Sequence, residues 1–398
     1  MKNTTLAIIG VGYVGINLAV RFPQFFKTFA FDIDNEKIDS LKKGIDLSEQ
    51  FSTEEISNSG CIFTSNIEIL ADANYYLITV PTPLDSYHKP DQSRVLEAVE
   101  GLRDYLSPGD TIVVESTVMP GTTKSIRELI GRDDIYFAFS PERVSPNDNF
   151  IKFEDIVKVV SCDSKDKLRD LEFIYNKIFR RVELSQDIEA SEFSKLLENT
   201  SRDISIAMMN EFYQGALKKG IDFKEALRLA RSKWNFPNVD KGLVGGHCIS
   251  IDPHYLSAFL ESKEDSIILK ARRVNDLMVS SLKERILEIS KSGDKILLLG
   301  KIYKRNCNDT RNSRALLLYE ELKNHTDRIV ESFDPYTDKA KKLTDYREYD
   351  LIVSLVAHDE FAQLRKEEWT EILKPKAVIL DFAQVTPKGL ENQFKVYY

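Results

Sequence analysis

The chain has 398 residues, of which 42% are hydrophobic, and a formal net charge of −8. Two or three domains are expected, because one hydrophobic core does not ordinarily organise a chain of this length. The negative charge argues against nucleic acid or an anionic membrane as a general partner, and no apolar run approaches the ~18 residues of a membrane span.

The cysteines and the start of the chain indicate a reducing compartment. Cys61, Cys162, Cys248 and Cys307 lie far apart and form no Cys-x-x-Cys pair, so they do not resemble a disulfide framework. The first apolar run begins by Leu6 and a Gly-rich turn follows at once, which does not fit a signal peptide. We therefore expect a cytoplasmic protein.

Residues 1–185 alternate short apolar runs with helical stretches. The runs are LAIIG, TFAFDID, YYLITVP, TIVVEST, IYFAFSP and IVKVVS. Runs of this kind are typical of buried parallel strands, and their spacing indicates βαβ units. We expect a doubly wound α/β domain of the Rossmann type over this range.

The turn after the first strand predicts a dinucleotide site. It reads G-x-G-x-x-G from Gly10 through Gly12, Tyr13 and Val14 to Gly15. The first glycine permits the turn, the second lets amides approach a pyrophosphate, and the third lets helix and strand pack closely. The helix N-terminus adds partial positive charge. The next strand ends in Asp32, where a carboxylate would bind a ribose 2′-hydroxyl and repel a 2′-phosphate, so NAD is favoured over NADP.

Three more strand ends carry polar motifs. They are Pro81–Pro83 (PTP), Glu115–Thr122 (ESTVMPGT) and Ser140–Arg143 (SPER). Open α/β sheets bind ligands at the carboxyl ends of their strands, so these motifs could line one crevice. Ordinary turn chemistry is the alternative.

A long helix is expected at residues 188–219, where apolar residues recur at helical spacing. At 1.5 Å per residue it would be ~48 Å long, which suits a bridge between domains or a dimer interface. Lys195 and Asn199 share one face of it, with Arg202 near the same stripe, unless this is only a solvated face. Helix continues to about residue 232, and another helix is expected at 266–291, giving a central helical domain over 186–291.

The loop between these helices contains GLVGGHCISIDPHYL, at Gly242–Leu256. Its cysteine, Cys248, could be a buried small residue, a nucleophile, or a metal ligand beside two histidines and Asp252, although the spacing matches no standard zinc pattern. The preceding Gly-Gly indicates that backbone passes close to something. Asp252 precedes Pro253, which should hold it out of a helix and let it face the same cavity.

From residue 292 the alternation returns, with KILLLG, RIVESFDP, DLIVSLVA and AVILDFA. This pattern predicts a smaller, Rossmann-like α/β domain over 292–398. The expected architecture is thus an N-terminal Rossmann domain, a long central helix with a helical dimerisation region, and a C-terminal α/β domain.

The motifs together resemble those of the UDP-glucose/GDP-mannose dehydrogenase family, the nucleotide-sugar 6-dehydrogenases. G-x-G-x-x-G, PTP, ST, SPER, KLLEN, GGHCISIDP and KRNCNDTRNS span essentially the whole chain. The resemblance implies two NAD-dependent oxidations of a sugar CH₂OH to a carboxylate, a C-terminal domain that binds the nucleotide sugar, and at least a homodimer through the long helix. No metal is expected, because the ligand spacing around Cys248 matches no standard zinc pattern.

The resemblance also assigns roles to individual residues. Cys248 matches the nucleophile, Lys195 and Asn199 the oxyanion-stabilising pair, Asp252 with Thr117 the groups that position a water, and Glu142 an acid that assists thioester hydrolysis. The residues that match the family's cofactor contacts are the glycine turn, Asp32, Lys37, Thr82, Thr117 and Arg311. The residues that match its substrate contacts are Glu142, Arg143, Lys195, Asn199, Arg202, Gly245, His254, Arg272, Asn275 and Lys304.

The substrate branch is suggested by two segments, SPERVSP and KWNF…GLVGGHCISIDPHYL. They look most like the branch that acts on UDP-N-acetylhexosamines (gluco, galacto or manno) for capsule or O-antigen uronic acids; UDP-glucose is second and GDP-mannose a distant third. A catalytically silent NAD- or nucleotide-sugar-binding regulator is the non-enzyme alternative, against which the intact set of Cys248, Lys195, Asn199 and Asp252 argues. One loop and two single positions depart from the family. The loop Pro237–Lys241 lacks the usual Pro-Gly, Asn308 replaces a usual Asp, and Arg314 replaces a common Pro.

Overall fold

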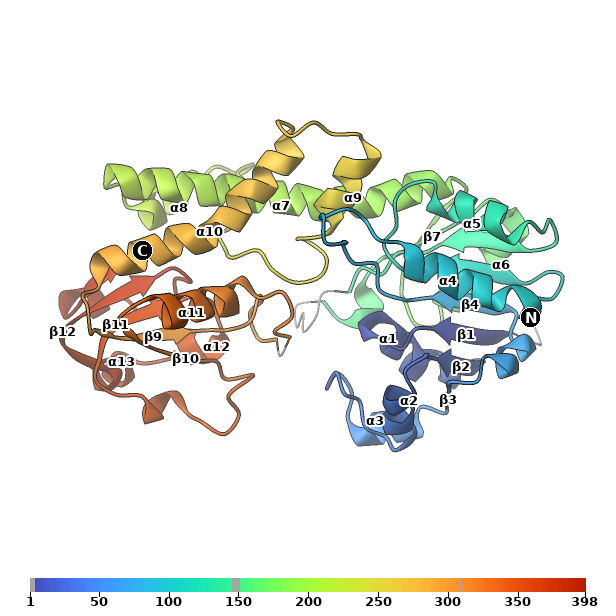
Figure 1. The fold of residues 1–398 in the computed structure, drawn as a ribbon, viewed down its shortest axis with the longest axis horizontal. Coiled ribbons are helices and arrows are strands. Elements are labelled where there is room, and N and C mark those ends of the chain that lie inside the picture. The colour runs from blue at the N-terminus through green and yellow to red at the C-terminus, as the bar shows by residue number, and fades with distance from the viewer. Residues whose placement is uncertain (1–3, 145–150, 308) are drawn as a thin grey trace. The chain divides into compact units, whose positions relative to one another are not determined.

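The computed structural model describes residues 4–144, 151–307 and 309–398 (Figure 1). It contains two compact units, one of Met1–Glu198 with His254–Leu260 and the other of Asn199–Pro253 with Glu261–Tyr398. The end of the SPERVSP segment, Ser145 and Pro146, and the substituted position Asn308 lie outside the described residues. The three-domain division at 1–185, 186–291 and 292–398 stays a prediction.

The first unit is built on an eight-stranded sheet of order β3-β2-β1-β4-β5-β6-β7-β8. All six predicted runs form strands. The strands are β1 (Thr5–Ile9), β2 (Lys27–Phe31), β3 (Ile62–Thr64), β4 (Tyr75–Ile78), β5 (Thr111–Val114), β6 (Tyr136–Phe139), β7 (Lys158–Cys162) and β8 (Val182–Ser185). The short β3 and β8 were not predicted.

The last two strands of this sheet run against the direction of the other six. β7 pairs with β6 in an antiparallel register, Ala138 opposite Cys162, and with β8 in a parallel one. The expectation that IVKVVS would run parallel to the strands before it was therefore wrong. Parallel neighbours need a crossover, usually a helix. Within its described part, the link from β6 to β7 holds only one short 3₁₀ turn, Phe153–Asp155, and the chain returns antiparallel.

Both faces of the sheet are covered, which explains the continuously apolar strands. In β1, Leu6 and Ile8 pack toward α1, α2 and α6, whereas Ala7 and Ile9 pack toward α4 and α5. The helices of this unit are α1 (Tyr13–Arg21), α2 (Asn35–Lys42), α3 (Thr53–Asn58), α4 (Ser93–Leu102), α5 (Thr122–Ile130) and α6 (Lys165–Tyr175). Alternate side chains of a strand point to opposite faces, so a strand buried on both sides has no polar face.

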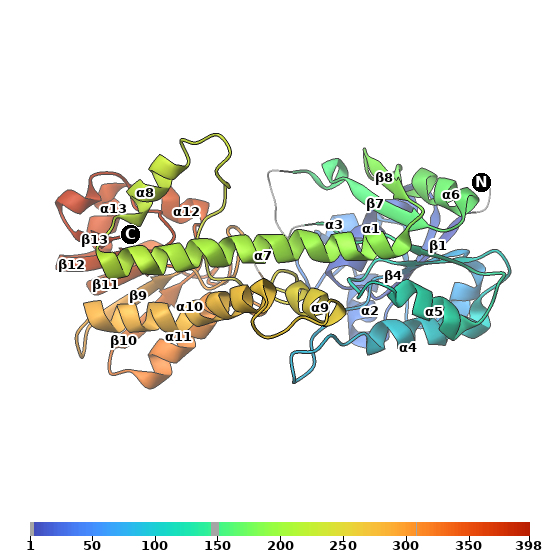
Figure 2. The same ribbon diagram turned by 90° about the horizontal axis from the view of Figure 1, so that it is seen from above.

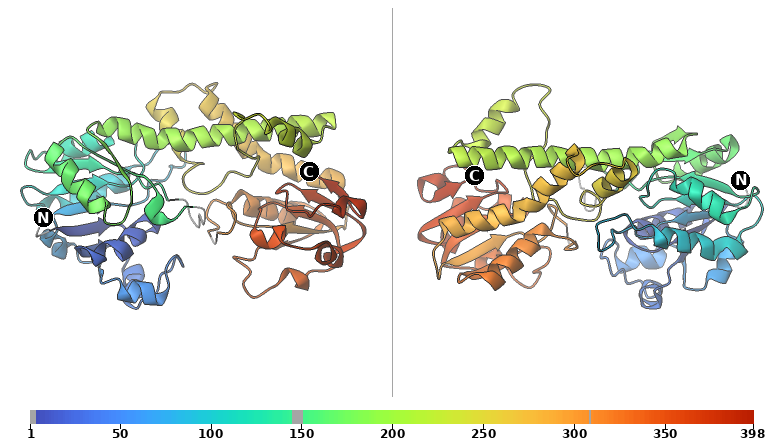
Figure 3. Two further views of the ribbon diagram at one scale, coloured as in Figure 1. Left: turned by 180° about the vertical axis from the view of Figure 1, so that it is seen from behind. Right: turned by 45° about the horizontal axis from the view of Figure 1, so that its top comes forward.

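The second unit holds a parallel five-stranded sheet of order β10-β9-β11-β12-β13 (Figure 3). The four predicted runs form β9 (Lys295–Leu299), β10 (Ile329–Phe333), β11 (Tyr349–Ser354) and β12 (Leu373–Asp381); the edge strand β13 (Lys395–Tyr397) was not predicted. Helices α10 (Ile267–Ile289) and α11 (Arg314–His325) cover one face. Helices α12 (Asp359–Ala362) and α13 (Lys366–Ile372) cover the other.

The long helix has the predicted extent. α7 runs from Ile188 to Lys219 without a break (Figure 2). It is followed by α8 (Phe223–Ala230), and α9 (Asp252–Phe259) begins just after the cysteine stretch. In the described parts of the chain, no helix is both long enough and apolar enough to cross a membrane.

Candidate active site

The glycine turn has the shape that a pyrophosphate needs. Gly10 has φ +95°, and a Cβ there would lie 2.9 Å from Cγ1 of Val80. A Cβ on Gly15 would clash with the carbonyl of Gly10. Gly12 differs, because it is the N-cap of α1 and a Cβ on it would meet no protein atom within 4 Å. The second glycine thus leaves open space in front of a helix N-terminus, and the turn fits a bound dinucleotide.

Asp32 lies directly after β2 and is tied to this turn. Its Oδ2 accepts hydrogen bonds from Val11 N at 2.9 Å and from Lys37 Nζ at 2.7 Å. Its Oδ1 accepts from Asp34 N at 3.0 Å. The carboxylate therefore fixes the entry to the glycine turn and brings the predicted cofactor contact Lys37 beside it.

Hydroxyl groups join the end of β5 to the end of β4, and the end of β4 to the glycine turn. Ser116 Oγ donates to Val80 O at 2.6 Å, and Thr79 Oγ1 donates to Gly10 O at 2.6 Å. Thr82 and Thr117 follow these two strand ends and are half-buried. Both predicted cofactor threonines consequently lie at the carboxyl edge of the sheet, as the glycine turn does.

Glu142 and Lys195 meet in the first unit. Lys195, buried on α7, donates from Nζ to the backbone carbonyl of Glu142 at 2.6 Å. Oε1 of Glu142 accepts from the backbone amide of Arg143 at 2.6 Å. Oε2 is buried without a hydrogen-bond partner among the described residues. A buried carboxylate oxygen without a partner is costly, so this oxygen needs an explanation beyond packing.

Cys248 lies in a turn that leads directly into α9. Its carbonyl accepts from Ile251 N at 3.0 Å and from Asp252 N at 2.9 Å. The cysteine is exposed, whereas Cys162 and Cys307 are buried. Exposure removes the alternative of a buried core cysteine. Among the described residues, no three His, Cys, Asp or Glu side chains are grouped so that they could hold a metal ion.

Asp252 is the first residue of α9, so the expectation that Pro253 would keep it out of a helix was wrong. Proline is tolerated in the first turn of a helix, where its missing N–H has no intrahelical partner to lose. Asp252 is buried, and its Oδ2 accepts from Asn199 Nδ2 at 2.6 Å. Asn199 stands one turn after Lys195 on α7.

Three family models together span most of the chain. Residues 4–179 match the NAD binding domain of the UDP-glucose/GDP-mannose dehydrogenase family, residues 189–277 its central domain, and residues 297–388 its UDP binding domain. The chain belongs to this dehydrogenase family. It is accordingly an oxidoreductase whose cofactor is NAD.

Full-length comparisons agree with the family models. UDP-N-acetyl-D-glucosamine 6-dehydrogenase from Salmonella typhi is 34% identical over 410 residues, covering 96% of each chain. Protein CapL from Staphylococcus aureus is 33% identical, covering 98% of this chain and 97% of the relative. The structure of UDP-D-ManNAc dehydrogenase from Pyrococcus horikoshii matches with a TM-score of 0.86 at 29% identity, covering 99% of both chains.

In this family member, two predicted substrate residues lie in a buried polar network. Arg272 pairs with the carboxylate of Asp203, which also accepts from Asn275 Nδ2 at 2.7 Å. Asn275 Oδ1 accepts from Asn210 Nδ2 at 2.8 Å, and Asn210 Oδ1 accepts from Gly242 N at 2.9 Å. The network joins α7 and α10 to the start of the cysteine stretch.

The other predicted substrate residues have varied surroundings. Arg202 is exposed, and Lys304 is half-buried. The Arg143 guanidinium pairs with Glu198 at 2.7 Å. The imidazole of His254 stacks on His88, with ring centroids 5.7 Å apart. Gly245 packs against the turn that contains Arg311.

Arg311, the predicted NAD contact from the UDP binding domain, pairs with Asp309 at 2.7 Å. Its charge also acts on His247, the neighbour of Cys248. Burial, followed by the positive charge of Arg311, lowers the pKa of the His247 imidazole. This shift favours the neutral form of the imidazole next to Cys248.

Sequence reasoning missed a buried charge cluster beneath Glu142. Lys158 Nζ pairs with the carboxylate of Glu115 and donates to the carbonyls of Ser140 and Pro141 at 3.1 and 3.2 Å. The other oxygen of Glu115 accepts from the hydroxyl of Tyr175. The cluster holds the ends of β5 and β6, which precede Thr117 and Glu142. IVKVVS offered one signal, a lysine inside a buried strand.

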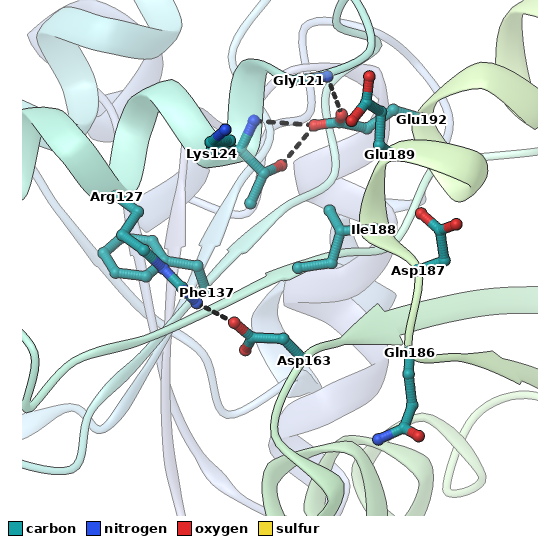
Figure 4. Close-up of a pocket in the computed structure, with 11 residues that line it drawn as sticks. Gly121, Lys124, Arg127, Phe137, Asp163, Gln186, Asp187, Ile188, Glu189 and Glu192 are labelled. Atoms are coloured by element: carbon teal, nitrogen blue, oxygen red, sulfur yellow. Dashed lines mark hydrogen bonds and ion pairs between the residues drawn. The ribbon is translucent and has the colours of Figure 1, made fainter.

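A second missed residue, Glu192, anchors the start of α7. Its buried carboxylate accepts from Gly121 N at 2.6 Å, Thr123 N at 2.8 Å and Thr123 Oγ1 at 2.6 Å, and so caps the N-terminus of α5 (Figure 4). Lys195 follows three residues later. Glu192 also lines a cavity of about 480 Å³ beside α5, together with Lys124, Arg127 and Asp163. None of the predicted site residues lines this cavity.

Proposed function

We propose that this chain is an NAD-dependent UDP-N-acetylhexosamine 6-dehydrogenase with Cys248 as nucleophile. It would oxidise the C6 hydroxymethyl twice, so that R–CH₂OH, two NAD⁺ and one water give R–COO⁻, two NADH and three H⁺. The observation that carries the proposal is the exposed Cys248 in a turn directly before Asp252, whose carboxylate is bound by Asn199.

The cofactor would be held by the glycine turn and Asp32. Gly12 leaves room for the pyrophosphate at the N-terminus of α1, and Asp32 offers a carboxylate to the adenosine ribose. Lys37, Thr82, Thr117 and Arg311 are proposed as further contacts. Bound there, the cofactor would supply the hydride acceptor for each of the two oxidations.

Cys248 would act between the two oxidations. The first converts the alcohol to an aldehyde, and the thiolate adds to the aldehyde carbon to form a thiohemiacetal. Loss of the second hydride leaves a thioester on Cys248, and water then releases the carboxylate and the thiol. Lys195 and Asn199 would donate to the oxygen that becomes negative, and one such donor is typically worth ~3 kcal/mol.

The hydrolysis step needs a base and an oriented water. We propose Glu142 as the base. Its Oε1 is held by a backbone amide, and its Oε2 is buried without a partner among the described residues. Asp252, with Thr117, is proposed to orient the water. Arg143, Arg202, Gly245, His254, Arg272, Asn275 and Lys304 are proposed on the substrate side.

The sugar class rests on full-length relatives. The Salmonella typhi relative is named for UDP-N-acetyl-D-glucosamine and the Pyrococcus horikoshii one for UDP-D-ManNAc. We infer a UDP-N-acetylhexosamine for this chain, with the uronic acid product destined for a surface polysaccharide.

We also propose a homodimer through α7. Met208 and Phe212 lie four residues apart on this helix and are 36% and 53% exposed. Leu229 on α8 is 56% exposed. Large apolar side chains on neighbouring positions of a helix are typical of an interface, and a two-fold axis would let the same face cover itself.

The test is NADH formation with a panel of UDP-GlcNAc, UDP-GalNAc, UDP-ManNAc, UDP-glucose and GDP-mannose. The proposal expects turnover of at least one UDP-N-acetylhexosamine, two NADH per sugar, and a preference for it over UDP-glucose. Cys248→Ser should bind NAD normally and form no net acid. Tight NAD binding without turnover of any sugar would favour a regulator, and normal acid formation by Cys248→Ser would refute the nucleophile.

A further inference from the structure

We propose that Asn312 is a positioning residue for Cys248, because it holds both ends of the turn Gly246–Ser250. The proposal rests on the role of Cys248 in the proposed function. Asn312 belongs to the UDP binding domain and is 64 positions beyond the cysteine. The two segments lie in the same compact unit.

Three hydrogen bonds join Asn312 to this turn. Its Nδ2 donates to Gly246 O at 3.0 Å and to Ser250 Oγ at 2.9 Å. Its backbone carbonyl accepts from Gly246 N at 3.3 Å. Ser250 Oγ in turn donates to Gly246 O at 2.6 Å, so one carboxamide closes the five-residue turn around Cys248.

The two glycines before His247 are pressed against the same region. A Cβ on Gly245 would clash with the backbone carbonyl of Asn312. Gly246 has φ +84°, and a Cβ there would lie 2.8 Å from the ring of Tyr303. The Gly-Gly pair is thus explained by close approach to the UDP binding domain of the chain itself.

Asn312 is well suited to serve as a fixed anchor. Its φ is +52°, a conformation that asparagine tolerates better than most residues. On one side of it, Asp309 Oδ1 accepts from Arg311 N at 3.0 Å. On the other, Ser313 caps α11 by accepting from Leu316 N at 3.3 Å and donates to the carbonyl of Lys301. The anchor is therefore attached to the start of a helix.

The consequence concerns the second oxidation. The first oxidation does not use the thiol, but the second requires the sulfur to reach the aldehyde carbon in one geometry. A displacement of ~1 Å in such a group can cost about 10²-fold in rate. Loss of the Asn312 carboxamide should therefore slow aldehyde oxidation and leave alcohol oxidation intact.

The first experiment measures hydrogen exchange in peptides covering residues 242–252 of the full chain without substrate. Asn312→Gly keeps the left-handed backbone and the carbonyl but removes both donors. Asn312→Asp keeps size and shape but cannot donate to Gly246 O. Asn306→Gly is the matched control, since Asn306 has φ +54° and its Nδ2 donates to Asp359 at 2.7 Å instead.

Both Asn312 variants should exchange the amides of Gly246, Ile251 and Asp252 at least ~10-fold faster than the wild type, and Asn306→Gly should not. The second experiment counts NADH per sugar consumed, with hydroxylamine to capture aldehyde. The Asn312 variants should fall from two NADH toward one, with an unchanged KM for NAD. Unchanged exchange, or equal loss of both oxidations, would overturn the proposal. Hydrogen exchange needs no substrate. The anchoring of the turn by Asn312 can therefore be tested even if the chain turns over none of the sugars.

Discussion

The side-chain amide of Asn199 donates to Oδ2 of Asp252 across 2.6 Å, and Asp252 is only 2% exposed. Lys195 stands one turn earlier on α7 and donates to the carbonyl of Glu142. A single helix thus carries two donors, four residues apart, each bound to a segment that contains a proposed catalytic carboxylate. The contact predicts the outcome of changing Asn199.

Asn199→Asp should lower kcat by about 10²- to 10³-fold without changing the affinity for NAD. Two carboxylates within hydrogen-bond distance repel unless they share a proton, and one donor to the developing oxyanion is lost, worth ~3 kcal/mol. Steady-state kinetics and NAD titration measure the two effects. Asn199→Ala, which removes the donor without adding charge, should lose less; kcat within threefold of wild type in both would contradict the role.

The glycine turn allows a matched pair of substitutions. Gly12→Ala should fold like the wild type, since its Cβ would meet no protein atom within 4 Å, but should weaken NAD binding at least ~10-fold. Gly15→Ala should instead destabilise the first unit by about 3 kcal/mol, because its Cβ would clash with Gly10 O. Calorimetric titration with NAD and thermal unfolding separate the two. Wild-type NAD affinity in Gly12→Ala would argue against a pyrophosphate at this turn.

Glu142→Gln should leave the acyl-enzyme intact. The amide oxygen can still accept from Arg143 N, but the side chain no longer takes a proton from water, so hydrolysis should slow by about 10²- to 10⁴-fold. A burst of NADH followed by slow turnover is expected, and intact mass spectrometry should find the sugar acyl group on Cys248. Glu198→Gln, at the exposed partner of Arg143, is the control and should show no burst.

Lys241, in the loop that departs from the family, should make stability depend on pH. It is buried among Tyr213, Phe223 and Phe382 and donates to Phe382 O at 2.9 Å. Burial lowers the pKa of Lys241 to about 8. Between pH 8 and its ordinary value of 10.5 the unfolded chain binds the proton more tightly, so stability rises with pH in this window.

Lys241→Met should therefore be more stable to unfolding than the wild type at low pH. The full cost of burying the ammonium, about 3 kcal/mol, applies below pH 8 and disappears as pH rises to 10.5. Urea unfolding at pH 7 and pH 10, followed by the fluorescence of buried Trp369, measures the difference between variant and wild type. A difference that stays constant over this range would show that Lys241 does not titrate there.

Phe212→Glu should convert the proposed dimer to monomer, since a desolvated charge at a two-fold interface meets its own copy. Light scattering after size exclusion measures the mass, and a monomeric wild type would refute the interface. Glu211→Gln, at the neighbouring exposed position, is the control and should stay dimeric.

Local features of the chain were predictable. The strand runs, the extent of α7 and the glycine turn follow from periodicity and from steric limits that act over a few residues. The turn before α9 was predicted only in part. The Gly-Gly pair correctly indicated a close approach of the backbone. The expectation for Asp252 failed because a proline can either exclude the preceding residue from a helix or occupy the first turn of one.

Sequence alone determined the fold class and the family, because apolar spacing and motif chemistry are carried by adjacent residues. Tertiary structure decided which groups meet. Glu192 caps a helix that begins 70 positions earlier, Lys158 meets Glu115 across 43 positions, and Asn312 closes a turn that begins 66 positions before it. No local sequence pattern specifies such partners. Packing of the surrounding core brings the distant groups together, and each polar group buried in this way then needs a hydrogen-bond partner.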